Sequence, residues 1–210
     1  AEGFDGASPE TRPARLGGRE KSQVPFAGGR RETGRPFMVI ATQNPVGQAG
    51  TYRLPEAQLD RFLMKTSIGY PGREAGIDVI LGSAAPDRTR TLSPVISTKA
   101  VADMADLAAN NYVDRSIAAY VQDLCEASRA DSEVRIGVST RGAIAMMRAA
   151  RVWAIAQGRN FVIPDDVQAL AVRVWAHRLV LDPDAEFGGA TREGVIERAL
   201  GAVAAPVMKG

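Results

Sequence analysis

Two short polar motifs combine residue types that could act on a phosphate group. The first, Thr42-Gln43-Asn44, directly follows an apolar run over residues 37–41. A polar side chain at the carboxyl end of a buried strand lies where α/β sheets bind ligands, so Asn44 can orient a water or contact a phosphate oxygen. The second motif, Asp60-Arg61, follows sixteen to seventeen residues later. The Arg61 guanidinium suits bidentate contact with phosphate, and one that reaches a neighbouring subunit's phosphate stabilises transition-state charge.

A third candidate is Arg141, which directly follows Ser139-Thr140. We expect that pair to cap the N-terminus of a long helix. A basic charge in the first turn of a helix is unfavourable beside the positive end of the helix dipole. The position of Arg141 therefore indicates a role other than helix stability.

Each candidate also has a plain structural interpretation. Asn44-Pro45 is a typical turn pair. Asp60-Arg61 can form a surface ion pair, which is worth less than about 1 kcal/mol. Arg141 can be an ordinary exposed arginine. On spacing alone, these structural interpretations are the more frequent ones.

Composition excludes several classes of protein. The formal net charge of +2 is too small to indicate nucleic-acid binding, and the arginines are spread along the chain. A single cysteine, Cys125, permits no internal disulfide and is expected to be a packed thiol, while a single histidine, His177, makes a zinc site improbable. No apolar run approaches the roughly 20 residues that span a bilayer. The first residues lack the order of a signal peptide, so we expect a cytoplasmic protein.

The candidates lie on an α/β segment that precedes a set of helices. The pattern predicts strands over residues 37–42 and 66–70 and a short helix over residues 54–63. The region before them, residues 1–35, is rich in Gly and Pro and reads as irregular, with a loose hairpin around Gly28-Gly29.

From residue 71 onward the pattern is helical. We expect helices over 72–83, 97–110, from the Asp114 cap, over 139–157, from Pro164, and over 191–204. Their inward faces are predicted to be Ile77, Ile80 and Leu81; then Val101, Met104, Leu107 and Ala108; then Ile117, Tyr120, Val121, Leu124 and Cys125. Trp153 and Trp175 are expected in the helical core.

The stretch ATQNPVGQAGTYRLPEAQLDRF, residues 41–62, resembles the MoxR family of AAA+ ATPases almost residue for residue. In that family ATQNP ends the sensor 1 strand and LPEAQLDRF holds the arginine finger. The resemblance covers about residues 36–185, and it continues through GYPGRE at 69–74, GVSTR at 137–141, RAARVWA at 148–154 and GRNFVIPDDV at 158–167. At Ile163 the family more often has a capping Thr, a difference that affects helix stability rather than chemistry.

The resemblance implies a role for each candidate. Asn44 would be sensor 1, which positions the attacking water near the γ-phosphate. Arg61 would be the finger that acts on ATP bound by the next subunit, and Arg141 would be sensor 2, which reaches from the lid to the γ-phosphate. The implied architecture is α/β plus α: residues 36–70 end a truncated P-loop core, and residues 71–210 form an all-helical lid. Within residues 1–35, a pre-sensor 1 hairpin is expected.

The parts that hold phosphates and magnesium are not found in the sequence. The segment GGREKS at 17–22 comes nearest to a phosphate-binding loop, but Glu20 would repel phosphates there. The segment LVLD at 179–182 imitates a Walker B strand, but Pro183 follows it. In the resembled family both motifs precede the sensor 1 strand. We therefore expect the C-terminal part of an ATPase, inactive alone, with ATP and Mg²⁺ used by the complete protein and no metal held by this chain.

Two kinds of function remain open. The resemblance implies ATP hydrolysis in a ring, expected to be hexameric, coupled to chaperone-like remodelling of a client, with von Willebrand factor A domain proteins as partners. The alternative is a non-catalytic helical module that binds a protein or, less plausibly for this charge, nucleic acid. Nucleotide-dependent assembly with an upstream half would favour the ATPase, whereas DNA binding with a steep salt dependence would favour the nucleic-acid version.

Overall fold

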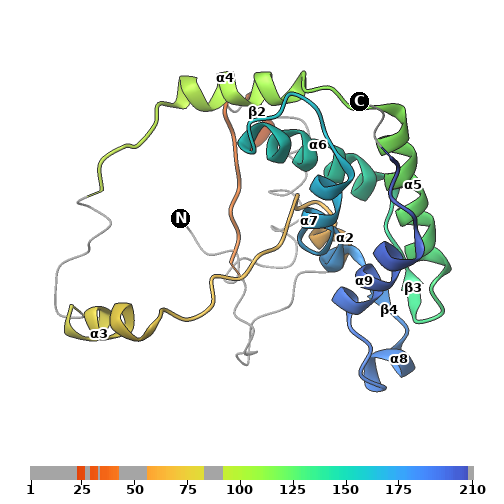
Figure 1. Ribbon diagram of the computed structural model, residues 1–210. Helices are drawn as coiled ribbons and strands as arrows, with labels where there is room; N and C mark the ends of the chain where they lie inside the picture. The colour runs from red at the N-terminus through yellow and green to blue at the C-terminus, as the bar shows by residue number, and fades with distance from the viewer. Residues whose placement is uncertain (1–22, 27–28, 33, 43–55, 83–91, 208–210) are drawn as a thin grey trace.

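The computed structural model describes residues 23–26, 29–32, 34–42, 56–82 and 92–207 (Figure 1). Strands β1 (Gln23–Phe26) and β2 (Gly29–Glu32) pair antiparallel, with Gln23 opposite Glu32. The predicted hairpin at this position is confirmed.

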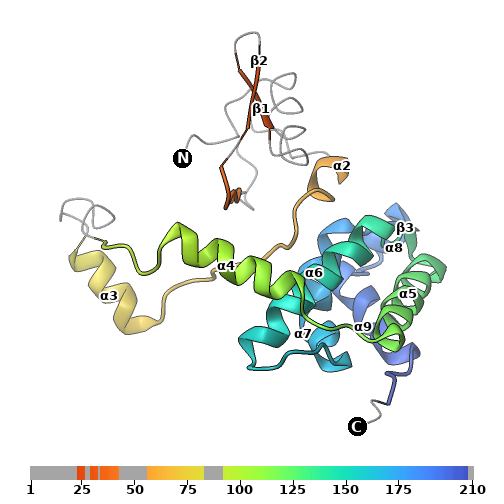
Figure 2. The ribbon, with the colours of Figure 1, turned by 90° about the horizontal axis from the view of Figure 1, so that it is seen from above.

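A bundle of helices forms the C-terminal half of the chain (Figure 2). Its main members are α5 (Arg115–Ala130), α6 (Thr140–Ala156), α7 (Pro164–Trp175) and α9 (Arg192–Ala202). Their apolar faces meet in one hydrophobic core. The largest side chains buried there include Ile117, Leu124, Met146, Val167, Val174, Trp175 and Ile196.

Local capping explains where these helices begin and end. The Asp114 carboxylate accepts a hydrogen bond from the Ser116 N–H at 2.8 Å, and the Ser139 hydroxyl accepts one from the Gly142 N–H at 3.2 Å. Gly158, with φ of +77°, follows the C-terminus of α6 in the left-handed conformation that glycine adopts readily. The predicted helix starts at 114, 139 and 164 are confirmed.

The N-terminus of α7 lacks a side-chain acceptor at its cap, Ile163. The Asp166 carboxylate instead accepts a hydrogen bond from the Ile163 N–H at 2.9 Å and pairs with Arg159 at 2.8 Å. Aspartates in the first turn also favour the positive end of the helix dipole. The missing Thr is therefore offset by Asp166, which is 2% exposed.

A small sheet at one end of the bundle was not predicted. Strand β3 (Val134–Ile136) pairs antiparallel with β4 (Val180–Leu181), which follows the 3₁₀ turn η3 (Ala176–Arg178). Asp182 then caps α8 (Pro183–Phe187) by accepting a hydrogen bond from the Asp184 N–H. The carboxylate that imitated a Walker B acid is thus a helix cap.

The predicted strands over 37–42 and 66–70 are wrong. Both segments are described, and neither belongs to a strand. Ile40 is 77% exposed and Tyr70 is fully exposed. A strand is stable only when a neighbour accepts and donates its backbone hydrogen bonds, and the described residues place no such neighbour beside either segment.

The helix predicted over 54–63 ends earlier than expected, and residues 54–55 lie outside the described residues. Helix α2 (Glu56–Leu59) is followed by one further turn, in which the Arg61 and Phe62 N–H groups donate to the Gln58 and Leu59 carbonyls at 3.2 and 3.0 Å. The Asp60 and Phe62 carbonyls that come next accept hydrogen bonds from a side chain of the bundle, as described below.

For the two helices before the bundle, the predicted positions are confirmed, but the faces predicted to be buried are partly exposed. Helix α3 (Arg73–Leu81) lies apart from the bundle in both views, so Ile80 and Leu81 are 72% and 77% exposed (Figures 1 and 2). Helix α4 (Thr98–Ala109) packs on α6 with Ala108 buried, but Met104 and Leu107 are more than half exposed. Periodicity locates an apolar face, and only tertiary contacts decide whether that face is covered.

Two tryptophans were also predicted in the core. Trp175 is 1% exposed, which confirms its assignment, whereas Trp153 is 39% exposed and lies at the surface of α6. Cys125 is buried, and burial raises the pKa of its thiol to about 11, as expected for a packed thiol rather than a nucleophile.

Among the helices that the structure describes, none combines the length and the apolar character that a membrane span requires.

The first turn of α6 offers a sensitive test of the packing. A Cβ at Gly142 would lie 2.6 Å from Val138 Cγ1 and 3.2 Å from Arg178 Cδ. We therefore expect Gly142→Ala to lower the free energy of unfolding by about 1–3 kcal/mol through overpacking. The matched variant Gly201→Ala, on α9 with nothing within 4 Å of the new Cβ, is expected to gain about 0.5–1 kcal/mol. Urea unfolding of both variants measures the difference, and a Gly142→Ala protein as stable as the Gly201→Ala protein would contradict this packing.

Candidate functional site

Two of the three predicted site residues lie among the described residues. Asn44 lies outside them. Arg61 is exposed in the turn that follows α2, and Arg141 lies in the first turn of α6 with its side chain 50% exposed. Although Arg61 and Arg141 are eighty residues apart in the sequence, the fold brings their segments together.

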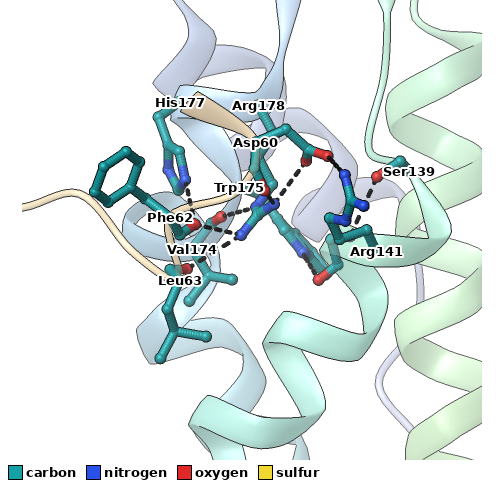
Figure 3. A network of polar contacts seen from close by, with 10 residues as sticks. Asp60, Phe62, Leu63, Ser139, Arg141, Val174, Trp175, His177 and Arg178 are labelled. Atoms are coloured by element: carbon teal, nitrogen blue, oxygen red, sulfur yellow. Dashed lines mark hydrogen bonds and ion pairs between the residues drawn. The ribbon is translucent and has the colours of Figure 1, made fainter. Parts of the chain in front are cut away.

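Asp60 makes this connection (Figure 3). Its Oδ1 atom lies 2.6 Å from Nη1 of Arg178, and its Oδ2 atom lies 3.3 Å from Nη1 of Arg141. The Asp60 side chain is only 24% exposed. Asp60 therefore pairs across the fold with two basic residues of the bundle, and the plain interpretation of a surface pair between Asp60 and Arg61 does not describe its main partners.

Arg178 provides most of the hydrogen bonds between residues 60–63 and the bundle. Its side chain is 2% exposed. Nε donates to the Val174 carbonyl at 2.8 Å, Nη2 donates to the Phe62 carbonyl at 2.6 Å, and Nη1 also donates to the Asp60 carbonyl. Burial of a charge is costly unless it is paired and hydrogen-bonded, and here both conditions are met.

His177 reinforces the same junction. It is 5% exposed, and its Nε2 lies 3.1 Å from the Phe62 carbonyl oxygen. Because a carbonyl only accepts, the neutral ring must carry its proton on Nε2. Burial lowers the pKa of His177; the Phe62 carbonyl and Asp60 act in the opposite direction, and Arg178 and Lys65 add to the lowering.

A backbone hydrogen bond completes the junction. The Lys65 N–H donates to the Arg173 carbonyl at 2.9 Å, and on the other side the Trp175 indole Nε1–H donates to the Gly142 carbonyl at 3.0 Å. These hydrogen bonds connect the C-terminal end of α7 to the N-terminal end of α6 and to residues 60–65. We refer to residues 60–65 together with His177 and Arg178 as the junction.

The arrangement suits an anionic ligand. Arg61 is exposed next to Asp60, and Arg141, which contacts Asp60, is half exposed. Guanidinium groups bind phosphate oxygens in a planar, bidentate manner. Among the described residues, no group of three or more Asp, Glu, His or Cys side chains could hold a metal ion.

Sequence reasoning did not identify Arg178. The residue lies in the segment VWAHRLVL, residues 174–181, where an arginine and the single histidine interrupt an otherwise apolar run. An arginine inside an apolar segment is a usable signal, because lysine and arginine are almost never fully buried without a partner. The partner, Asp60, lies more than a hundred residues earlier in the chain. The residues around Arg178 therefore do not reveal which carboxylate pairs with it.

The pKa of His177 leads to a prediction about stability and pH. Its pKa in the folded protein is lower than the ordinary value of 6.5, so the unfolded chain binds more protons as the pH falls toward and below 6.5. The free energy of unfolding should therefore fall between about pH 7.5 and pH 5.5. Because this is the only histidine, His177→Gln should make the unfolding free energy less dependent on pH over that interval, as urea titrations at both pH values would show. An equally steep loss in both proteins would contradict a buried neutral imidazole.

Two protein families match different parts of the chain. Residues 1–64 match the ATPase family associated with various cellular activities (AAA), and residues 126–199 match the AAA lid domain. The second range contains Arg141 and Arg178, and the first contains Asn44, Asp60 and Arg61. The junction therefore joins the end of an AAA segment to an AAA lid.

Individual relatives agree with this assignment. The chain is 39% identical over 209 residues to the uncharacterized protein YeaC of Bacillus subtilis, of which it spans 65%. It is 38% identical over 182 residues, 81% of the chain, to Chaperone MoxR1 of Mycobacterium tuberculosis, of which it spans 47%. Protein MoxR of Paracoccus denitrificans is 32% identical over 73% of the chain and 51% of the relative.

A solved structure gives the same result for the fold. A candidate ATPase from Cytophaga hutchinsonii superposes with a TM-score of 0.88 at 29% sequence identity, over 99% of this chain and 66% of that protein. The chain thus spans between about half and two thirds of the relatives that it matches. The chain belongs to the MoxR family of AAA+ ATPases.

Proposed function

We propose that this chain supplies the sensing and completing residues of an ATP site in a ring-forming, MoxR-like AAA+ ATPase. Asn44 acts as sensor 1, Arg61 as the arginine finger toward the ATP of a neighbouring subunit, and Arg141 as sensor 2. In this proposal residues 36–70 end the ATPase core, and residues 71–210 form the lid.

One observation carries the proposal. The Arg141 guanidinium and the Asp60-Arg61 segment meet at a distance of 3.3 Å between Arg141 Nη1 and Asp60 Oδ2. Arg61 is an exposed residue, and the Arg141 side chain is half exposed. These guanidinium groups support the proposal because phosphoryl transfer depends on positioning and on neutralising the charge of the phosphate oxygens.

The chain alone is proposed to be inactive. The described residues contain no group of three or more Asp, Glu, His or Cys side chains that could hold a metal ion, and the sequence offers no acceptable phosphate-binding loop. When bound, Mg²⁺ would supply neutralisation of the phosphate charge. We propose that the loop and the magnesium ligand belong to an upstream part of the ATPase core, as implied by relatives that are longer than this chain.

The client is proposed by class only. MoxR1 of Mycobacterium tuberculosis is described as a chaperone, so we propose that ATP turnover drives remodelling or assembly of a protein complex. The ring is proposed to be hexameric, with a von Willebrand factor A domain protein as partner, on the resemblance to the family alone.

The ATPase proposal predicts how the two arginines affect turnover. In a protein that joins this chain to an ATPase core carrying the phosphate-binding loop, Arg61→Ala should lower kcat by about 100-fold or more, since a lost finger leaves transition-state charge uncompensated. Arg141→Ala should lower kcat by about tenfold or more for the same reason. Steady-state release of inorganic phosphate measures both.

Arg198→Ala is the matched control. Its side chain is also 50% exposed and pairs with Asp131 and Glu133 elsewhere in the bundle, so its kcat should stay within about twofold of the parent, as for most surface substitutions. The isolated 210-residue chain should show no turnover. Equal losses in all three variants, or turnover by the isolated chain that Asn44→Ala abolishes, would contradict the proposal and favour a non-catalytic interaction module.

A further inference from the structure

Arg178 brackets the proposed arginine finger. Its guanidinium donates to the Asp60 carbonyl on one side of Arg61 and to the Phe62 carbonyl on the other, the latter at 2.6 Å, with a longer contact to the Leu63 carbonyl at 3.4 Å. Nη1 also contacts Asp60 Oδ1 at 2.6 Å. The backbone on both sides of Arg61 is therefore held by one rigid, planar group.

The Arg178 guanidinium is itself held in place by the lid. Arg178 Nε donates to the Val174 carbonyl at 2.8 Å, so the guanidinium is tied to the end of α7 while its other nitrogens hold residues 60–63 (Figure 3). The neighbouring His177 donates to the same Phe62 carbonyl at 3.1 Å. The direction in which the Arg61 side chain leaves the backbone is thus set by the lid rather than by the short helix α2.

We propose that Arg178 is a positioning residue for Arg61: it orients the finger and makes that orientation depend on the lid. This role rests on the proposed function, because it presumes that Arg61 acts on a phosphate. Misplacement of a reacting group by about 1 Å can cost roughly 100-fold in rate, so a residue that never touches the nucleotide can still control turnover.

Lysine is the informative substitution at this position. Arg178→Lys keeps a positive charge for Asp60, but a single ammonium group replaces the planar fork. It can no longer donate from a fixed plane to the Asp60 and Phe62 carbonyls and to Val174 at once. Arg178→Gln, which is neutral and keeps an amide donor, serves as a second variant.

The test uses the ATPase-competent protein that joins this chain to the phosphate-binding core. Arg178→Lys and Arg178→Gln should lower kcat by about tenfold or more while KM for ATP changes by less than about threefold. The double variant Arg61→Ala/Arg178→Lys should be no slower than Arg61→Ala alone, because a positioning residue has no effect once the group that it positions is gone.

The matched control is Arg159→Gln. Arg159 also pairs with a buried carboxylate, Asp166, but wholly within the bundle, so its loss should lower the melting temperature without lowering kcat more than about twofold. Amide exchange gives an independent readout. The Phe62 and Lys65 N–H groups should exchange about tenfold faster or more in both Arg178 variants, while the amides of α5 keep their parental protection.

The outcomes separate the two proposals. A kcat within about twofold of the parent in both Arg178 variants, or a loss that multiplies with that of Arg61→Ala, would overturn the positioning role and leave the ATPase proposal intact. A parent protein without turnover, or one whose turnover survives Arg61→Ala, would overturn the proposed function and the positioning role with it. Loss of α5 protection in both Arg178 variants would show a role in folding and would also overturn the positioning role.

Discussion

A buried guanidinium, that of Arg178, holds residues 60–63 against the helical bundle. A charge with only 2% of its side chain exposed is tolerated because Asp60, two nearby carbonyls and the end of α7 satisfy it. Removing one partner would leave the other buried and unpaired, which is among the costliest changes in a protein interior. The contact therefore specifies one arrangement of residues 60–65 on the bundle, to which His177 and the Lys65 backbone add further hydrogen bonds.

This arrangement couples two groups that an ATPase would need to coordinate. The Asp60 carboxylate is shared between buried Arg178 and half-exposed Arg141, and Arg61 is the next residue in the chain. A movement of the lid that displaced Arg141 or Arg178 would change the surroundings of Asp60 and hence of Arg61. In a MoxR-family protein, proposed to link ATP turnover to remodelling of a client, such a connection would give the lid a physical route to Arg61, the proposed finger.

Local signals in the sequence predicted much of the bundle. They could not predict which strands or charged residues pair when these are far apart in the sequence. Asp114, Ser139 and Pro164 mark helix starts because capping depends on only a few neighbouring residues. The strands expected at 37–42 and 66–70 failed because a strand depends on partners that periodicity cannot supply, and β3 and β4 were missed because they are short and far apart in the sequence. Residue type and position made Arg61 and Arg141 candidates, and the resemblance supplied their proposed roles. Arg178 was missed because its partner Asp60 is distant in the sequence.

Mixing two inactive variants of the complete ATPase tests most directly whether this chain completes a neighbour's ATP site. Subunits with Asn44→Ala lack the proposed sensor 1 side chain, and subunits with Arg61→Ala lack the proposed finger. If the finger acts between subunits, a random equal mixture contains some interfaces with an intact Asn44 on one side and an intact Arg61 on the other, and turnover should recover to about a quarter of the parental rate. A mixture that stays as inactive as either variant alone would contradict a finger that acts on the neighbouring subunit.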